Sequence, residues 1–116
     1  MSIPKDADGD AMRLVIANGA DLTRSMRIDF QIDCPDLATA RAIGARVPRD
    51  EFEVSVYQNP GRTDATCECS RYMLLEHSEL VRIQARLSEL AEPFGCRCVA
   101  WGTFGNKQGA EPDATP

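Results

Sequence analysis

The chain has 116 residues, of which 43% are hydrophobic and 27% charged, a balance typical of a single soluble globular domain. The formal net charge is −5, so the composition offers no electrostatic footprint for the phosphate backbone of a nucleic acid. Basic protein surfaces are more natural partners, because opposite charges accelerate encounter.

The sequence also predicts where the protein resides. Residues 1–8 lack the apolar run of a secretory signal, and no stretch approaches the roughly 18 apolar residues of a membrane span. We therefore expect a cytoplasmic protein with no membrane association. In that reducing compartment the five cysteines are expected to be free thiols.

The first predicted elements are a short helix and a strand. Three aspartates precede a mainly apolar segment that ends before Gly19, which predicts a helix over about residues 8–18. Apolar and polar residues then alternate over 26–33, the cleanest strand pattern in the chain. Pro35 suits the first turn of a following helix with one apolar stripe, and Pro48 ends it.

Two strands, a helix and a last strand complete the order. Alternation over 51–57 and 65–72 predicts strands, and the turn chemistry of 59–64 joins them as a loose hairpin. Apolar residues at helical spacing predict a helix over about 76–92. A last alternating segment, 96–101, predicts the fourth strand.

The order βαββαβ predicts an α+β, ferredoxin-like sandwich. Its antiparallel four-stranded sheet would carry helices on one face, with an extra N-terminal helix. The domain is expected to cover residues 6–104. Residues 105–116 have nothing to bury, so we expect a disordered C-terminal tail.

The cysteine pattern has two interpretations. Cys67 and Cys69, with Cys96 and Cys98, resemble two halves of a zinc site. In a ferredoxin-like sheet, however, their strands flank the first strand and lie about 10 Å apart, too far for shared coordination. We favour small buried hydrophobic residues and expect no metal. Cys34 lacks the partner of a C-x-x-C redox motif.

No catalytic constellation is found. His77 is the single histidine and is expected near a helix start, where a capping or surface role is the commoner one. A calcium loop beginning at Asp6 would need Gly at position 11 and Glu at position 17, and this chain has Ala11 and Ala17 there. The acidic run is better interpreted as a helix start. We expect a non-enzymatic protein without a cofactor.

Alternation predicts which residues lie on the sheet face turned away from the helices. Acidic side chains outnumber basic ones there, in the set Arg27, Asp29, Gln31, Asp33, Glu51, Glu53, Ser55, Tyr57, Thr66, Glu68, Ser70, Tyr72, Arg97, Val99 and Trp101. One interpretation is a solvated face without function. The other is a protein-docking surface with aromatic anchors. Alternation does not choose between them.

If this face docks a protein, the candidate contacts are Asp29, Glu53, Tyr57, Glu68, Tyr72 and Trp101. Trp101 has an alternative role, because a large aromatic at a strand end can pack against the N-terminal helix. Direct RNA binding, which the same topology performs elsewhere by stacking bases on sheet aromatics, is disfavoured. The centre of this face carries Glu68 and Ser70 beside Asp29, and its carboxylates would repel phosphates.

Four features of the sequence occur in the same order in a known family. They are the opening Asp8-Gly9-Asp10-Ala11, the strand and helix from Met26, the Phe94-Gly95 stop and the ending Trp101-Gly102-Thr103-Phe104. With these features the chain resembles the regulator of ribonuclease E activity B (RraB) family. The resemblance covers about residues 6–104. This chain has Val99 and Ala100 where the family commonly has Asp and Gly.

The resemblance implies a protein-binding regulator rather than an enzyme. Members of the family bind the non-catalytic scaffold region of ribonuclease E and restrain RNA decay. We therefore hypothesise an inhibitor or modulator of ribonuclease E or its RNA degradation complex, acting through an acidic surface as a monomer or weak oligomer. Two alternatives stay open: an immunity-type or other small module that binds a different basic protein, and a thiol-based metal binder.

Overall fold

The computed structural model describes residues 3–106, and the order of elements within them is the predicted one. The elements are α1 (Ala7–Ala17), β1 (Met26–Cys34), α2 (Leu37–Gly44), β2 (Glu53–Gln58), β3 (Ala65–Met73), α3 (His77–Ala91), the 3-10 turn η1 (Glu92–Phe94) and β4 (Arg97–Gly102). Each predicted helix and strand is therefore confirmed, with boundaries shifted by a few residues.

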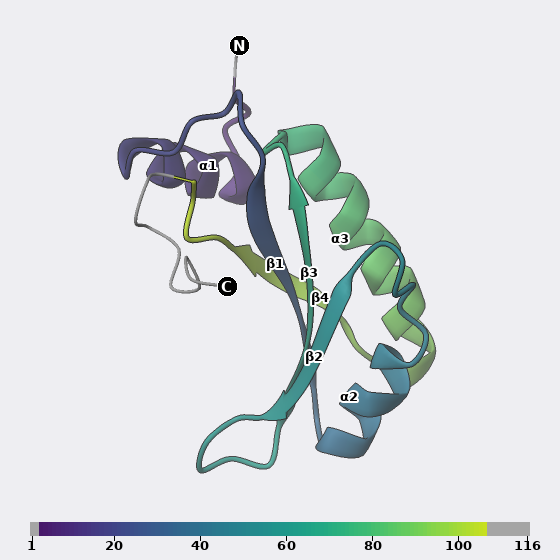
Figure 1. The fold of residues 1–116 in the computed structure, drawn as a ribbon. Coiled ribbons are helices and arrows are strands. Elements are labelled where there is room, and N and C mark those ends of the chain that lie inside the picture. The colour runs from purple at the N-terminus through teal and green to yellow at the C-terminus, as the bar shows by residue number, and fades with distance from the viewer. Residues whose placement is uncertain (1–2, 107–116) are drawn as a thin grey trace.

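The four strands form one antiparallel sheet in the order β2-β3-β1-β4. Helices α2 and α3 cover one face of the sheet, and α1 lies at one end of it beside the start of α3 (Figure 1). This is the expected α+β ferredoxin-like arrangement. We call the face turned away from α2 and α3 the open face.

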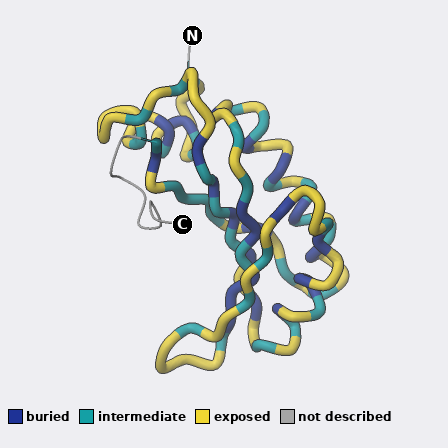
Figure 2. Tube along the Cα trace, viewed as in Figure 1, coloured by how far each residue is buried: buried dark blue, intermediate teal, exposed yellow. Residues whose placement is uncertain are grey.

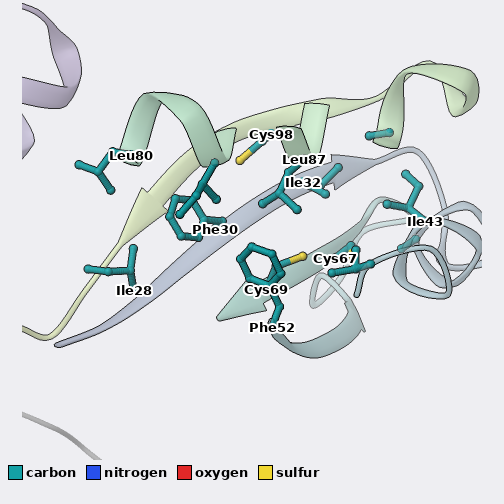
Figure 3. Packing of buried hydrophobic residues seen from close by; sticks show 14 of the residues in the cluster. Ile28, Phe30, Ile32, Ile43, Phe52, Cys67, Cys69, Leu80, Leu87 and Cys98 are labelled. Atoms are coloured by element: carbon teal, nitrogen blue, oxygen red, sulfur yellow. The ribbon is translucent and has the colours of Figure 1, made fainter. Parts of the chain in front are cut away.

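Alternation decides which side of each strand is buried. In β1, Met26, Ile28, Phe30 and Ile32 are fully buried, whereas the residues between them are partly exposed. These side chains meet Leu80 and Leu87 of α3 and Ile43 of α2 (Figure 3). The buried residues thus lie between the sheet and the two helices, and the outer loops are largely exposed (Figure 2).

Aspartate side chains cap the first two helices. Asp6 accepts a hydrogen bond of 2.7 Å from the backbone N–H of Gly9, and Asp36 accepts one of 2.7 Å from that of Thr39. The acidic run is therefore a helix start, as interpreted, with Asp6 as the cap and Asp8 and Asp10 in the first turn of α1. Gly95, in the left-handed region with φ 74°, ends η1 and turns the chain into β4.

The last described residues contact the start of β1 and the segment before it. The Thr103 hydroxyl donates to the backbone oxygen of Arg27 at 2.6 Å, and Asn106 Nδ2 donates to the backbone oxygen of Asp21 at 2.8 Å. Gly105 is buried in this return, so the structure places the first two residues of the predicted tail against the domain. The prediction of disorder for 107–116 lies outside the described residues.

A β-bulge in β4 overturns one predicted placement. Ile32 pairs with Cys98 but Gln31 pairs with Ala100, so Val99 is an extra residue in β4. After the bulge the alternation is shifted by one residue, and Trp101 lies opposite the buried Phe30 on the helix side. The expectation that Trp101 belongs to the open face was wrong, because strict alternation takes no account of an inserted residue.

Trp101 instead joins β4 to α1, the alternative interpretation of this residue. Its indole Nε1 donates to Asp8 Oδ1 at 2.9 Å, and the half-buried ring packs against the hydrophobic core. Gln84 of α3 donates to the other carboxylate oxygen of Asp8 at 3.2 Å. One carboxylate at the start of α1 therefore accepts from both β4 and α3.

Replacing Trp101 by Phe removes the indole N–H but keeps an aromatic ring in the core. We expect the free energy of unfolding to fall by about 1–2 kcal/mol, because the hydrogen bond to the Asp8 carboxylate is lost. Urea denaturation followed by far-ultraviolet circular dichroism measures the change. The matched control is Tyr72→Phe, which removes a polar group from an exposed aromatic residue on the open face and should leave the stability unchanged. Equal stability of Trp101→Phe and wild type would show that the bond contributes nothing.

Candidate functional site

The centre of the open face is a row of polar side chains across three strands. Asp29 of β1 lies opposite Ser70 of β3, which lies opposite Glu53 of β2. Directly opposed residues of antiparallel strands project to the same face, so these three side chains are neighbours. Two of the predicted contact residues, Asp29 and Glu53, are therefore brought together around Ser70.

A hydrogen-bond network holds this row. Ser70 Oγ donates to Asp29 Oδ1 at 2.6 Å. Arg27 Nε donates to the same oxygen at 3.2 Å, and Arg27 Nη2 donates to Glu53 Oε1 at 3.0 Å. The Arg27 guanidinium holds the pKa of Glu53 below its ordinary value, so this carboxylate is favoured in its charged form. Sequence reasoning did not single out Arg27 or Ser70 as partners of the carboxylates.

The next row carries the carboxylate of Glu68, another predicted contact residue. Glu68 lies between Ser55 of β2 and Gln31 of β1 and is partly buried. Burial raises the pKa of Glu68, and the negative charge of Asp29 adds to that effect. Glu53 and Glu68 thus have pKa values shifted in opposite directions.

The two predicted tyrosine contacts lie at opposite ends of the open face. Tyr57 pairs with Thr66 in one end row, and Tyr72 pairs with Arg27 in the other. Their exposed fractions are 37% and 59%, so both present large aromatic surface to solvent. The carboxylates of Asp29, Glu53 and Glu68 lie between them.

An open groove of about 740 Å³ begins at the Tyr72 end of this face. It is lined by Arg27, Glu53 and Tyr72 and continues over Glu51 and Arg71 where β2 begins. Charged groups of both signs line it, so it differs from an apolar small-molecule pocket. Two predicted contact residues, Glu53 and Tyr72, and Arg27, the hydrogen-bond partner of Glu53, thus border one groove.

His77, the single histidine, has a structural partner. His77 starts α3, and its Nε2 lies 2.9 Å from Asp6 Oδ2 at the start of α1.

Two further features are absent from the described part of the chain. Within residues 3–106, no group of three or more histidine, cysteine or acidic side chains is arranged to hold a metal ion. No helix in that range combines the length and apolar character needed to cross a membrane.

Comparison with known families identifies the chain's relatives. Residues 5–103 match the family described as RraB, regulator of ribonuclease activity B. The chain belongs to the RraB family. A comparison with curated proteins finds no match.

The RraB match extends over every helix and strand of the fold, from α1 to the end of β4. The family resemblance inferred from the sequence motifs is confirmed. RraB proteins regulate ribonuclease activity, which implies a protein partner for this chain. The motif end at Trp101 has a structural role here, since its ring and N–H connect β4 with α1.

Glu68→Gln tests the electrostatics of the open face. Because the folded-state pKa of Glu68 is raised above 4.5, ionisation costs stability as the pH rises through that pKa. We expect Glu68→Gln to melt at a higher temperature than wild type at neutral pH. The difference should vanish well below pH 4.5, where Glu68 is protonated in both states. Melting temperature against pH measures this, and a pH-independent difference would contradict it.

Proposed function

We propose that this chain is a non-enzymatic inhibitor or modulator of ribonuclease E, or of a related RNA degradation complex, that acts by binding a protein segment on its open face. Membership of the RraB family supports the regulatory role. The observation that carries the proposed site is the cluster of carboxylates between two exposed tyrosines, on the sheet face that α2 and α3 leave uncovered. The cytoplasm is the proposed place of action.

The charge of the open face supports a basic partner. Its carboxylates outnumber its guanidinium groups, with Asp29, Asp33, Glu53 and Glu68 against Arg27 and Arg97. The family resemblance implies the scaffold region of ribonuclease E, which is rich in basic RNA-binding segments, as the partner. A basic segment bound to these carboxylates would no longer be available to RNA phosphates. The proposed mechanism is therefore that this chain occupies an RNA-binding segment of its partner.

The proposed docking residues are Asp29, Glu53, Tyr57, Glu68 and Tyr72. Trp101 leaves this set because it lies on the helix side of the sheet. In the proposed complex, the carboxylates steer the encounter and the tyrosines lengthen the lifetime of the complex. A rigid sheet that already holds Glu53 and Asp29 through Arg27 loses little side-chain entropy on binding.

Charge reversal tests the proposed face. For the double variant Glu53→Lys and Glu68→Lys, we expect association with the purified scaffold region of ribonuclease E to slow by at least about tenfold at low salt. Surface plasmon resonance at low and moderate salt measures the rate. The control is Glu89→Lys with Glu92→Lys, the same charge change at exposed positions of α3 and η1.

The outcomes separate three possibilities. The proposal is supported if only the open-face variant associates more slowly and if wild-type binding weakens as the salt concentration rises. Equal slowing of both variants would indicate net charge rather than this face. If the wild-type chain does not bind ribonuclease E at all, a pull-down that recovers another basic protein would favour the immunity-type alternative.

Tyr72→Ala tests the proposed aromatic anchor. Exposed tyrosines that become buried at an interface often contribute more than 1 kcal/mol, so we expect dissociation to accelerate by roughly tenfold with little change in association rate. Leu14→Ala on α1, where the side chain is 64% exposed, removes a comparable apolar surface outside the face and is the control. An unchanged dissociation rate for Tyr72→Ala would remove this residue from the interface.

A further inference from the structure

Two cysteines lie opposite each other where β1 ends and β4 begins. Cys34 is the last residue of β1, and Cys96 immediately precedes β4. Asp33 pairs with Arg97 in the antiparallel register, so the next opposed pair is Cys34 with Cys96. The bulge at Val99 lies farther along β4 and leaves this pair in register.

Backbone hydrogen bonds define the type of this pair. The amide of Cys98 donates to Ser88 Oγ at 3.0 Å, and the amide of Cys96 donates to the backbone oxygen of Ala91 at 3.2 Å. Both amides thus point away from β1, toward α3. Cys34 and Cys96 are therefore a non-hydrogen-bonded pair, in which Cα atoms lie about 4.5 Å apart. Disulfides span Cα separations of about 4.4–6.8 Å, so this geometry suits one.

We propose that Cys34 and Cys96 are a redox-active pair that closes an intramolecular disulfide by exchange with a low-molecular-weight disulfide such as oxidised glutathione. The two thiols are neighbours: burial raises the pKa of Cys34, and the interaction with Cys96 raises it further. The pair lies on the helix side of the sheet, so the proposal is independent of the open face and of ribonuclease binding.

The exchange has two balanced steps. The Cys96 thiolate attacks one sulfur of the small disulfide, forming a mixed disulfide and releasing the first small thiolate. Cys34 then attacks the Cys96 sulfur of the mixed disulfide and gives its proton to the small thiolate that leaves, which departs as the second small thiol. The protein loses two hydrogens, and one small disulfide is reduced to two small thiols. Cys96 attacks first because it is partly exposed, whereas the side chain of Cys34 is 3% exposed.

The other thiols are less suited to the reaction. Cys67 and Cys69 also interact with each other, but both are fully buried, two residues apart on the same face of β3, and are out of reach of a dissolved disulfide. Residues with that spacing in a strand are about 6.7 Å apart with parallel side chains, at the limit for a disulfide. Cys98 lies opposite Ile32 and is largely buried. Selective linkage of Cys34 to Cys96 is the expected outcome.

Peptide mapping tests the proposal directly. The full chain is equilibrated with oxidised glutathione, free thiols are alkylated in acid, and the digest is analysed without reduction. Trypsin places Cys34 in peptide 28–41 and Cys96 in 87–97. Cys67 and Cys69 share peptide 63–71, and Cys98 lies in 98–107. We expect a covalent 28–41 to 87–97 species and loss of two hydrogens from the intact mass. Glutathione retained on Cys96, a different linkage or unreacted thiols would each overturn the proposal.

Matched variants and stability give a second readout. Cys96→Ser changes a partly exposed residue and should fold, but it should form no linkage; Cys98→Ala leaves the pair intact and should still form it. A disulfide closing residues 34–96 restrains the unfolded chain, so the oxidised protein should melt at least about 5 °C above the reduced one. Linkage in Cys96→Ser, or a melting temperature unchanged by oxidation, would contradict the inference.

Discussion

The structure depends on the two-sided position of β1 within the sheet. This strand pairs with β3 along its full length and with β4 over its second half, while its apolar side chains fill the space under α2 and α3. Ile28, Phe30 and Ile32 are large apolar side chains at successive inward positions, and their burial removes their apolar surface from water. No other strand has three such large buried side chains in a row. The register of β1 therefore sets the register of its neighbours, since a one-residue slip would turn every one of these side chains to solvent.

The same constraint determines what the open face can carry. Because alternate residues of β1 are committed to the core, Arg27, Asp29 and Gln31 project to the other side, where no helix covers them. Arg27 and Ser70 satisfy Asp29, so the strand carries charge on one face without leaving an unpaired buried group. A polar face whose carboxylates are held by neighbouring side chains is thus a consequence of how the core is built. Under the proposed function, the charge of that face would favour a basic partner.

Sequence reasoning predicted the fold well because its signals are local. Alternation in 26–33 and 65–72 identified the central strands and the buried cysteines of β3. Gly19 and Pro93 marked the ends of α1 and α3, whereas α2 ends at Gly44, four residues before the predicted stop at Pro48. The bulge at Val99 is not encoded by a comparable local pattern, since the extra residue is accommodated by pairing with β1 and by the Ser88 hydroxyl of α3. The links of Asp8 with Trp101 and of Arg27 with Glu53 join residues far apart in sequence, so only the assembled sheet reveals them.

The two faces of β1 would also keep the proposed docking surface apart from the proposed redox pair. Asp33 and Cys34 are consecutive, yet they project to opposite sides of the sheet, the carboxylate to solvent and the thiol toward the helices. A covalent link from Cys34 to Cys96 would change no charge on the open face. Its effect on a docked partner would have to pass through the twist between β1 and β4, which the bulge already increases. Oxidation should therefore alter the stability of the fold more than the electrostatics of recognition.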